Sequence, residues 1–363
     1  NKVRMAIGDE LILSRGRVQL PIFLPVATRG FVKAVPMNKI NELGITALIS
    51  NSVHLAISPG IETLERSGGI NGYTKFSGDY FTDSGGFQII KKELVKVNDV
   101  GITFRDRKSG KKIFVSPEYS SEIQAKIRSS VAMMLDDCPS YGDSLERIKL
   151  SVKRTYEWGR IFSERRVIGQ KKFGIIQGGF DPELRRESAK LMTSLDFDGF
   201  AIGGLKIGEP TELTDKILIK TLPLIPEGYP IYLMGVGDPL SIYRYSYLGV
   251  DIFDSTYPTR NARHGFALTS GGPVNLKNAK YMNYLGPIDD SCDCEACRNY
   301  SRSELREMYR NEDPSFQYLV TIHNLTFMNK FMEFIRNQDK NVIEIASKFS
   351  KINNLVNHSV LDG

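Results

Sequence analysis

Residues 80–88 carry the sequence YFTDSGGFQ, an apolar strand end that runs into a carboxylate, a hydroxyl and two glycines. Such a turn lets the backbone approach a flat ligand closely, because glycine has no side chain in the way. An Asp-Ser-Gly-Gly sequence is also typical of an ordinary tight turn, so this stretch alone does not establish a site. The residues that would face a ligand here are Asp83, Ser84, Gly85, Gly86 and Phe87.

Around this stretch, short apolar runs alternate with helical patterns about eight times along the chain. The runs are uninterrupted rather than alternating, which indicates parallel strands covered on both faces. The pattern predicts an α/β protein built as a (β/α)8 barrel, preceded by a β-hairpin. An open doubly wound sheet is the alternative, weakened by the absence of GxGxxG after the first strand. The predicted barrel strands are residues 22–26, 47–50, 81–83, 131–135, 173–176, 200–202, 231–234 and 252–253.

Polar or small residues follow several of these strands. Because all strand C-termini of a barrel face one mouth, they are expected to converge there. Any one of them alone is more typical of a structural role, but three aspartates and a glutamine together indicate a site. The residues at these strand ends are Asp83, Asp136, Gln177, Gly204, Met234 and Asp254.

Composition sets broad limits on the function. The chain has 363 residues, 41% hydrophobic and 25% charged, with a net charge of +6, which is compatible with an anionic partner. No run approaches 18 apolar residues and the first residues lack the apolar core of a signal peptide, so we expect no membrane association and a cytoplasmic location.

Three of the four cysteines lie in one short segment, as Cys292, Cys294 and Cys297. Three thiolates at this spacing can hold one metal ion, but tetrahedral zinc needs a fourth ligand from elsewhere. The chain has four histidines, at 54, 264, 323 and 358. His323 lies in an apolar helical stretch that could dock it against the cysteines, although a buried core histidine is the ordinary explanation of such a residue.

Seven motifs occur in order along the chain: DSGGFQ (83–88), MLDDC (134–138), IIQGG (175–179), FDGFAIGGLKIGE (197–209), YLMGVG (232–237), DIFDSTYPTRNARHG (251–265) and C-x-C-x2-C with a later His (292–323). Together they resemble the queuine tRNA-ribosyltransferase family, also called the tRNA-guanine transglycosylases. The resemblance covers nearly the whole chain, from residues 21–34 to 321–328.

The resemblance implies a catalytic barrel over residues 1–270 and a zinc-binding subdomain with closing helices over residues 271–363, as one structural unit. It also implies an enzyme of queuosine biosynthesis that exchanges guanine at the wobble position of tRNAs with a GUN anticodon for a 7-deazaguanine base. Family enzymes are commonly homodimers. One structural zinc ion per subunit would be held by the three cysteines and His323.

The residue-by-residue match implies Asp254 as the nucleophile and Asp83 as the general acid/base. Exchange without net hydrolysis needs a covalent ribosyl-aspartate intermediate, as in retaining glycosidases. The base would be held by Asp136, Gln177, Gly204 and Leu205, with Tyr232 and Met234 lining or sandwiching the base pocket. RNA contacts would come from Gly235, Val236, Gly237, Asp238, Pro239, Leu240, Ser241, Thr259, Arg260, Asn261, Ala262 and Arg263.

Two positions bear on which base enters. Cys138 matches the cysteine typical of bacterial members, and Ile207 is bulky where eukaryotic members have glycine. Both favour the small aminomethyl base preQ1, while queuine remains the alternative. Two further hypotheses are a non-catalytic RNA-binding partner subunit, which would lack some of the three aspartates present here, and a relative that modifies DNA.

Overall fold

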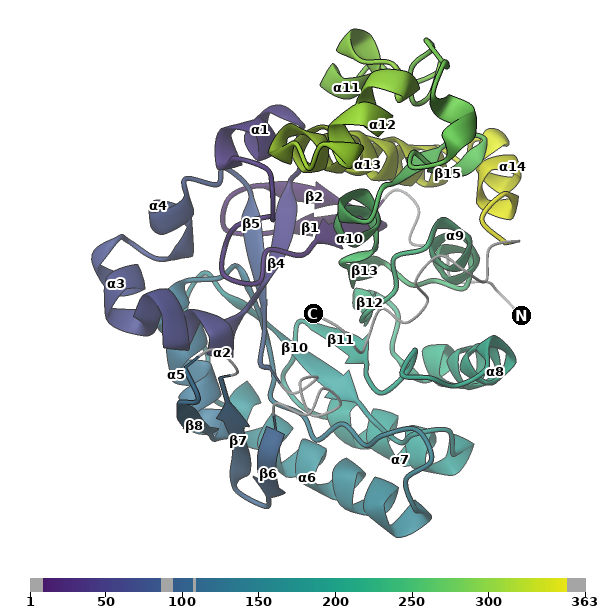
Figure 1. Cartoon of the computed structure of the whole chain (residues 1–363). Helices are drawn as coiled ribbons and strands as arrows, with labels where there is room; N and C mark the ends of the chain where they lie inside the picture. Colours follow the sequence, from purple (N-terminus) through teal and green to yellow (C-terminus); the bar gives the residue numbers. More distant parts are fainter. Residues whose placement is uncertain (1–8, 86–93, 107–108, 351–363) are drawn as a thin grey trace.

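A computed structural model describes residues 9–85, 94–106 and 109–350 of the chain (Figure 1). Eight parallel strands form one sheet in the order β3-β13-β12-β11-β10-β9-β5-β4. The sheet closes into a barrel, because Val26 pairs with Ile49 and the Ala27 N–H donates to the Ile49 carbonyl at 2.8 Å. The strands are β3 (Ile22–Pro25), β4 (Ala47–Asn51), β5 (Asp79–Asp83), β9 (Val131–Met133), β10 (Lys171–Ile176), β11 (Gly199–Ile202), β12 (Ile231–Leu233) and β13 (Ile252–Ser255).

The predicted barrel is therefore confirmed, and every strand begins and ends within two residues of its predicted bounds. Most strand residues are buried, as expected for strands covered on both faces. The ring of Phe81 meets the rings of Phe173 and Tyr232 edge to face inside the barrel, at centroid distances of 6.2 and 6.3 Å. Since side chains alternate along a strand, Asp83 points to the same side as Phe81.

Helices surround the barrel, and those predicted from the sequence are present (Figure 1). Ser116 was the expected N-cap of α5, and its hydroxyl accepts a hydrogen bond from the Tyr119 N–H at 3.1 Å. The long helix α6 ends at Ser163, three residues before its predicted end. These helices are α1 (Met37–Glu42), α5 (Pro117–Ile127), α6 (Leu145–Ser163), α7 (Pro182–Thr193), α8 (Thr211–Thr221) and α9 (Pro239–Tyr247).

Two of the three small antiparallel sheets that the structure describes outside the barrel precede its fourth strand, β9. The predicted N-terminal hairpin is formed by β1 (Glu10–Ile12) and β2 (Arg17–Gln19). The sequence did not predict the antiparallel sheet of β6 (Leu94–Asn98), β7 (Gly101–Arg105) and β8 (Lys112–Val115), which is inserted between β5 and α5. Short helices α2 (Ser52–Leu55), α3 (Ile61–Arg66) and α4 (Ile70–Thr74) were also not predicted.

The C-terminal part follows helix α10 (Tyr257–Arg263) and begins with the hairpin of β14 (Phe266–Thr269) and β15 (Gly272–Asn275). It continues through α11 (Glu295–Asn299), α12 (Arg302–Arg310), α13 (Pro314–Arg336) and α14 (Asn341–Ser347), which gather on one side of the barrel (Figure 1). Asn324 of α13 ties this part to the barrel, because its amide donates to the Pro258 carbonyl and accepts from the Leu268 N–H, both at 2.9 Å. The predicted division after residue 270 falls in the β14–β15 turn and stays a prediction.

Among the described residues, no helix combines the length and the apolar character needed to cross a bilayer.

Candidate active site and metal site

Asp254 lies in the last barrel strand, with its carboxylate half-buried at the barrel mouth. One of its oxygens, Oδ1, accepts hydrogen bonds from the Tyr232 hydroxyl at 2.6 Å and from the Gly235 N–H at 2.9 Å. Within the described residues, no hydrogen bond to Oδ2 is found. Burial raises the pKa of Asp254, and these two hydrogen bonds act against that rise. The arrangement fixes one carboxylate oxygen and leaves the other without a hydrogen bond among the described residues.

Asp83 ends strand β5, where its Oδ1 accepts from the Gly85 N–H at 2.8 Å. Burial raises the pKa of Tyr232, as do the negative charges of Asp254 and Asp83, so both carboxylates lie near this tyrosine. Gly85 has φ +78° and a Cβ there would meet a Val53 methyl at 2.8 Å, which explains why glycine occupies the turn. Ser84 is buried beside it. Gly86 and Phe87 lie outside the described residues.

A second group of predicted residues meets at the ends of β9, β10 and β11. The Gln177 side-chain amide donates to the Asp136 carboxylate at 2.6 Å, and both side chains are buried. Burial raises the pKa of Asp136 to about 7, with a smaller contribution from the charge of neighbouring Asp137, while the bond from Gln177 lowers it. In this structure one hydrogen bond joins the two side chains, and the buried Gln177 Oε1 has no partner among the described residues.

The loop after β11 closes against Gln177. A Cβ on Gly203 would lie 2.5 Å from Gln177 Nε2, and one on Gly204 would lie 2.7 Å from Gln177 Oε1. Only glycine lets this backbone approach the amide so closely, and Gly204 also has φ +69°. Leu205 follows in a buried position, and Met234 is half-buried after β12. The structure thus brings Asp136, Gln177 and Gly204 together as predicted.

Helix α7 supplies two supporting residues that the sequence did not single out. The buried Arg185 donates to the carbonyls of Ile176 and Gly179 at 2.9 and 2.8 Å, and Ser188 accepts from the Gln177 N–H at 3.0 Å. Burial lowers the pKa of Arg185 to about 10. The available signal was an arginine on the apolar face of an amphipathic helix, where Leu184, Ala189 and Met192 are buried.

The first predicted RNA segment, residues 235–241, spans the turn after β12 and the first three residues of α9. Asp238 caps α9 by accepting from the Ser241 N–H at 2.9 Å. A Cβ on Gly237 would lie 2.3 Å from the Ser255 Cβ, so this turn packs directly on the strand that carries Asp254. Val236 and Pro239 are buried, and Leu240 is half-buried.

The second segment, residues 259–263, belongs to α10, immediately after the Asp254 strand. Arg263 is half-buried, whereas Thr259, Arg260, Asn261 and Ala262 are buried in this structure. Arg260 Nη1 has no hydrogen-bond partner among the described residues. Burial and the adjacent Arg260 lower the pKa of Arg263, which indicates that positive charge here lacks compensation.

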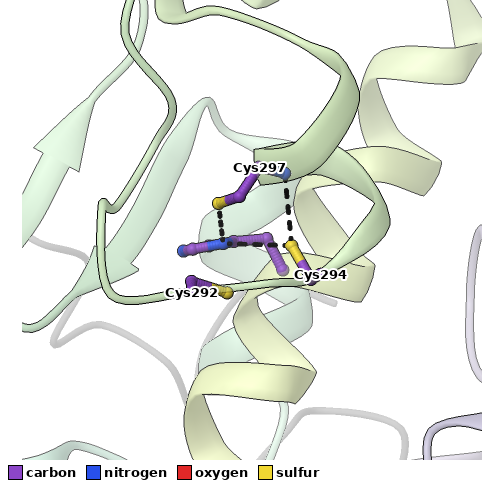
Figure 2. Close-up of side chains that lie close together, drawn as sticks. Cys292, Cys294 and Cys297 are labelled. Atoms are coloured by element: carbon purple, nitrogen blue, oxygen red, sulfur yellow. Dashed lines mark hydrogen bonds between the residues drawn. The ribbon is translucent and has the colours of Figure 1, made fainter.

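The three clustered cysteines converge with His323 of α13, and their four ligand atoms lie within 4.8 Å of one another. His323 Nδ1 is 3.5 Å from the sulfur of Cys294 and 3.3 Å from that of Cys297. Figure 2 shows the three sulfur atoms turned toward one another. The other His323 nitrogen, Nε2, donates to the Leu268 carbonyl at 2.8 Å, which leaves the Nδ1 lone pair for a metal.

Tetrahedral zinc with Zn–S of about 2.3 Å and Zn–N of about 2.0 Å separates its S and N ligands by roughly 3.5 Å, so this cluster can hold a metal and fits a zinc site. Of the other histidines, His54 lies on α2, His264 is exposed after α10, and His358 is outside the described residues.

Comparison with known proteins shows which family the chain resembles. A family model described as queuine tRNA-ribosyltransferase matches residues 7–349. The queuine tRNA-ribosyltransferase of Geobacillus kaustophilus (strain HTA426) is 40% identical over 324 residues, covering 88% of this chain and 85% of the relative. That of Thermotoga maritima is 40% identical, covering 89% of this chain and 88% of the relative. That of Enterococcus faecalis is 38% identical, covering 94% and 91%.

Proposed function

The chain belongs to the queuine tRNA-ribosyltransferase family and is a tRNA-guanine transglycosylase, and we propose that it replaces the wobble guanine of tRNAs with a GUN anticodon by preQ1. The exchange proceeds by two displacements at the ribose C1′, through a covalent ribosyl-aspartate. The observation that carries this proposal is the Asp254 carboxylate, held through one oxygen by Tyr232 and Gly235 at the barrel mouth. Both displacements invert C1′, so the overall configuration is retained.

In the first displacement, Asp254 Oδ2 attacks C1′ as the bond to guanine N9 breaks. The bonds from Tyr232 and Gly235 to Oδ1 fix the plane of the carboxylate, so that Oδ2 is presented in one direction. Guanine leaves with the electron pair of the C1′–N9 bond and takes up a proton from Asp83, acting as general acid. The target base must first leave the anticodon stack to reach this carboxylate.

In the second displacement, the incoming base attacks C1′ and returns the electron pair to Asp254. The base must lose its N9 proton, which we assign to Asp83 as general base. The proton released here balances the one that guanine gained. Asp83 suits this role because it is the last residue of β5 and therefore lies at the same barrel mouth as Asp254. Like Asp254, it also lies near Tyr232.

Recognition of the base is assigned to Asp136, Gln177, Gly204 and Leu205. An ionised Asp136 can accept hydrogen bonds from the ring N–H and the exocyclic amine of a guanine-like edge, while Gln177 and a backbone N–H serve the carbonyl. Since Gln177 donates to Asp136 in this structure, base binding requires that amide to turn to the base. Tyr232 and Met234 would line the pocket.

Base binding is expected to strengthen as pH rises through about 7. Below this pKa Asp136 is protonated and offers a donor where the base also donates; above it, both carboxylate oxygens accept. The KM for free guanine should therefore fall between pH 6 and pH 8 and then level. A KM that does not change with pH, or that rises with pH, would contradict the assignment of Asp136.

The preference for preQ1 rests on the surroundings of Gly204. A cavity of about 330 Å³ lies beside it, lined by Ile207, Tyr141 and Phe180 among others. Ile207 narrows the space available to a large 7-substituent, and Cys138 is buried against Asp136. The small aminomethyl group of preQ1 suits this wall better than the cyclopentenediol of queuine.

Replacing Ile207 with Gly is expected to raise the queuine-to-preQ1 ratio of kcat/KM by at least about tenfold, because it removes the side chain that crowds the larger substituent. The ratio is measured by competition between the two bases on one tRNA. Ile207→Val, which keeps the branched bulk, is the control and should change the ratio little. An unchanged ratio in the Gly variant would refute the steric explanation.

The RNA surface is assigned to residues 235–241 and 259–263, which flank Asp254 on its two sides. Arg263 and Arg260 would contact phosphates or bases of the anticodon loop, the latter after α10 adjusts to the RNA. We further propose one structural zinc at Cys292, Cys294, Cys297 and His323, and a homodimer as the active unit. A zinc ion bound there would have four protein ligands and no open position, so it would support the fold rather than the chemistry.

The proposed function is tested by incubating the protein with a GUN anticodon hairpin and labelled guanine. Label should enter the hairpin, and an identical hairpin with another wobble base should stay unlabelled. Absence of exchange with intact tRNA and zinc present would overturn the proposal. Exchange into DNA instead of RNA would also overturn it and would favour the alternative of a DNA-modifying relative.

A further inference from the structure

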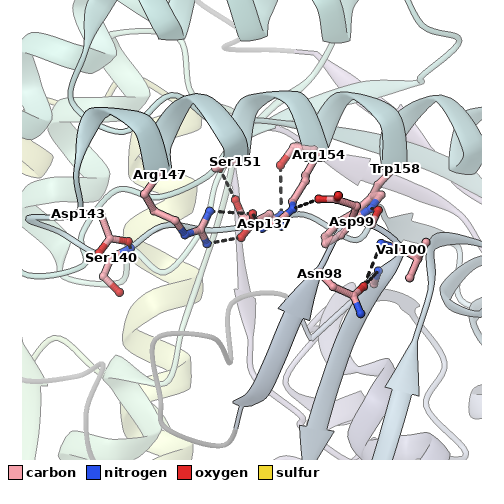
Figure 3. Close-up of polar contacts among 12 residues, drawn as sticks. Asn98, Asp99, Val100, Asp137, Ser140, Asp143, Arg147, Ser151, Arg154 and Trp158 are labelled. Carbon is pink, nitrogen blue, oxygen red and sulfur yellow. Dashed lines mark hydrogen bonds and ion pairs between the residues drawn. The ribbon is translucent and has the colours of Figure 1, made fainter.

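Asp137 directly follows the base-recognising Asp136, and the proposed chemistry gives it no part. Its carboxylate is completely buried. A buried carboxylate needs partners to offset its lost hydration. Those partners all come from one helix, α6 (Figure 3).

Four side chains of α6 bind Asp137. Arg147 donates to both carboxylate oxygens, at 2.8 and 2.5 Å, and Arg154 Nη1 lies 3.4 Å from Oδ2. Ser151 donates to the Asp137 carbonyl at 2.5 Å, and Thr155 accepts from the Asp137 N–H at 3.1 Å. The spacing 147, 151, 154 and 155 places all four on one face of the helix. Both peptide groups of Asp137, as well as its side chain, are therefore fixed.

Fixation of this kind matters because β9 ends at Met133, three residues before Asp136. One more strand-like bond follows, from the Met134 N–H to the Phe173 carbonyl at 3.1 Å, and residues 135–140 are not part of any helix or strand. The sheet therefore does not hold the backbone of Asp136. The next residue, Asp137, is held instead by helix α6, because its carbonyl accepts a hydrogen bond from Ser151 and its N–H donates one to Thr155.

The same helix face also holds the inserted sheet. Arg154 Nε donates to the Asp99 carboxylate at 2.7 Å, and Trp158 donates to the Asp99 carbonyl at 2.8 Å. Figure 3 shows Arg154 between Asp137 and Asp99, which lies in the turn between β6 and β7. Arg154 thus joins the insert to the segment that carries Asp136.

We propose that Asp137, clamped by the α6 face, is a positioning residue that aims the Asp136 carboxylate at the base, and that Arg147 and Arg154 offset the charge of Asp137 so that Asp136 stays available as an acceptor. The inference rests on the proposed role of Asp136 in base binding. Asp137 does not touch the base; it acts through its neighbour.

The arginines are essential to this role because the Asp137 charge opposes ionisation of Asp136. Around this pair, Arg147 and Arg154 of α6 bind Asp137, Cys138 follows it in the chain, and Arg185 of α7 acts on Cys138. The carboxylates of Asp143 and Asp99 act in turn on Arg147 and Arg154. Arg147 and Arg154 form ion pairs with Asp137 that offset its field at Asp136. Removing the Asp137 charge and removing an arginine should therefore shift the titration of Asp136 in opposite directions.

The test measures guanine binding to the full-length protein by calorimetry from pH 5.5 to 8.5, without tRNA. In Asp137→Asn, the pH midpoint of binding is expected to fall by about one unit, because the opposing charge is gone and the arginines remain. In Arg147→Met it is expected to rise by a similar amount, and Arg147→Lys should restore it in part. Arg160→Met, the same change at an exposed position of α6, is the control and should leave the midpoint unchanged.

Opposite shifts support the proposed charge balance between Asp137 and the arginines at Asp136, since a purely structural loss would weaken binding at all pH values without moving the midpoint. Midpoints that stay fixed, or that move in the same direction in both variants, overturn it. If Asp137→Asn does not fold, the Arg147→Met and Arg147→Lys pair decides alone. Labelled-guanine exchange by the wild-type protein is run in parallel, so that failure of the proposed function is recorded separately.

Discussion

Replacing Asp254 with Asn is expected to lower base exchange by about 10⁴-fold or more, the scale seen when a covalent nucleophile is removed. The amide is nearly isosteric, and its oxygen can keep the bonds from Tyr232 and Gly235. It lacks the negative charge needed to attack C1′. The measurement is the rate of labelled-guanine incorporation into a GUN hairpin, together with retention of a ribosyl–protein adduct on a denaturing gel.

The controls separate chemistry from binding. Asp254→Asn should bind the hairpin about as tightly as the wild type, because the substitution leaves the RNA surface in place. Tyr232→Phe removes one of the two donors to Oδ1 and should cost only about 10- to 100-fold, since Gly235 still orients the carboxylate. An adduct that persists in Asp254→Asn, or exchange at a tenth of the wild-type rate, would exclude Asp254 as the nucleophile.

The parts of this site that local sequence could predict are those that sit at strand ends. Asp83, Asp136, Gln177 and Asp254 each follow a short apolar run, and closure of a parallel barrel brings such positions to one mouth. That convergence brings Gln177 within hydrogen-bonding distance of Asp136. It also places Gly204 against the side-chain amide of Gln177. The assignment of Asp254 rather than Asp83 as nucleophile required the family resemblance.

Contacts between distant segments were not predictable in the same way. Tyr232 was expected only to line the pocket, whereas its hydroxyl binds Asp254, 22 residues away. The α6 face that holds Asp137 looks in the sequence like a helix with ordinary polar positions, because a period of 3.6 does not reveal what the face meets. The inserted sheet was missed because its three strands are short and partly exposed, so their pattern resembles that of a loop.

At the metal site the predicted residues meet in the structure, and the structure adds a connection from this site to α10, the helix that follows the Asp254 strand. The cysteine segment, residues 292–297, runs into the short helix α11, and its half-buried Cys292 and Cys297 pack at the edge of a core cluster. His323, by contrast, is buried on α13 and bound to the Leu268 carbonyl, while its neighbour Asn324 binds Pro258 of α10. A metal ion would therefore fasten the cysteine segment to the helix that packs behind the predicted RNA-binding residues of α10.

Replacing Cys294 with Ser is accordingly expected to abolish stoichiometric zinc and to lower Tm by about 10 °C or more, because structural zinc sites can supply several kcal/mol of folding free energy. Zinc content is measured by elemental analysis and Tm by calorimetry.

Cys138→Ser is the matched control, since Cys138 is buried in the barrel away from the cluster. The Cys138→Ser protein should keep its zinc. Chelator treatment of the wild type should reproduce the loss of Tm and leave the Cys294→Ser variant unaffected. A Cys294→Ser protein with wild-type Tm would show that the barrel does not depend on this site, and full zinc content in it would show that the ion binds elsewhere.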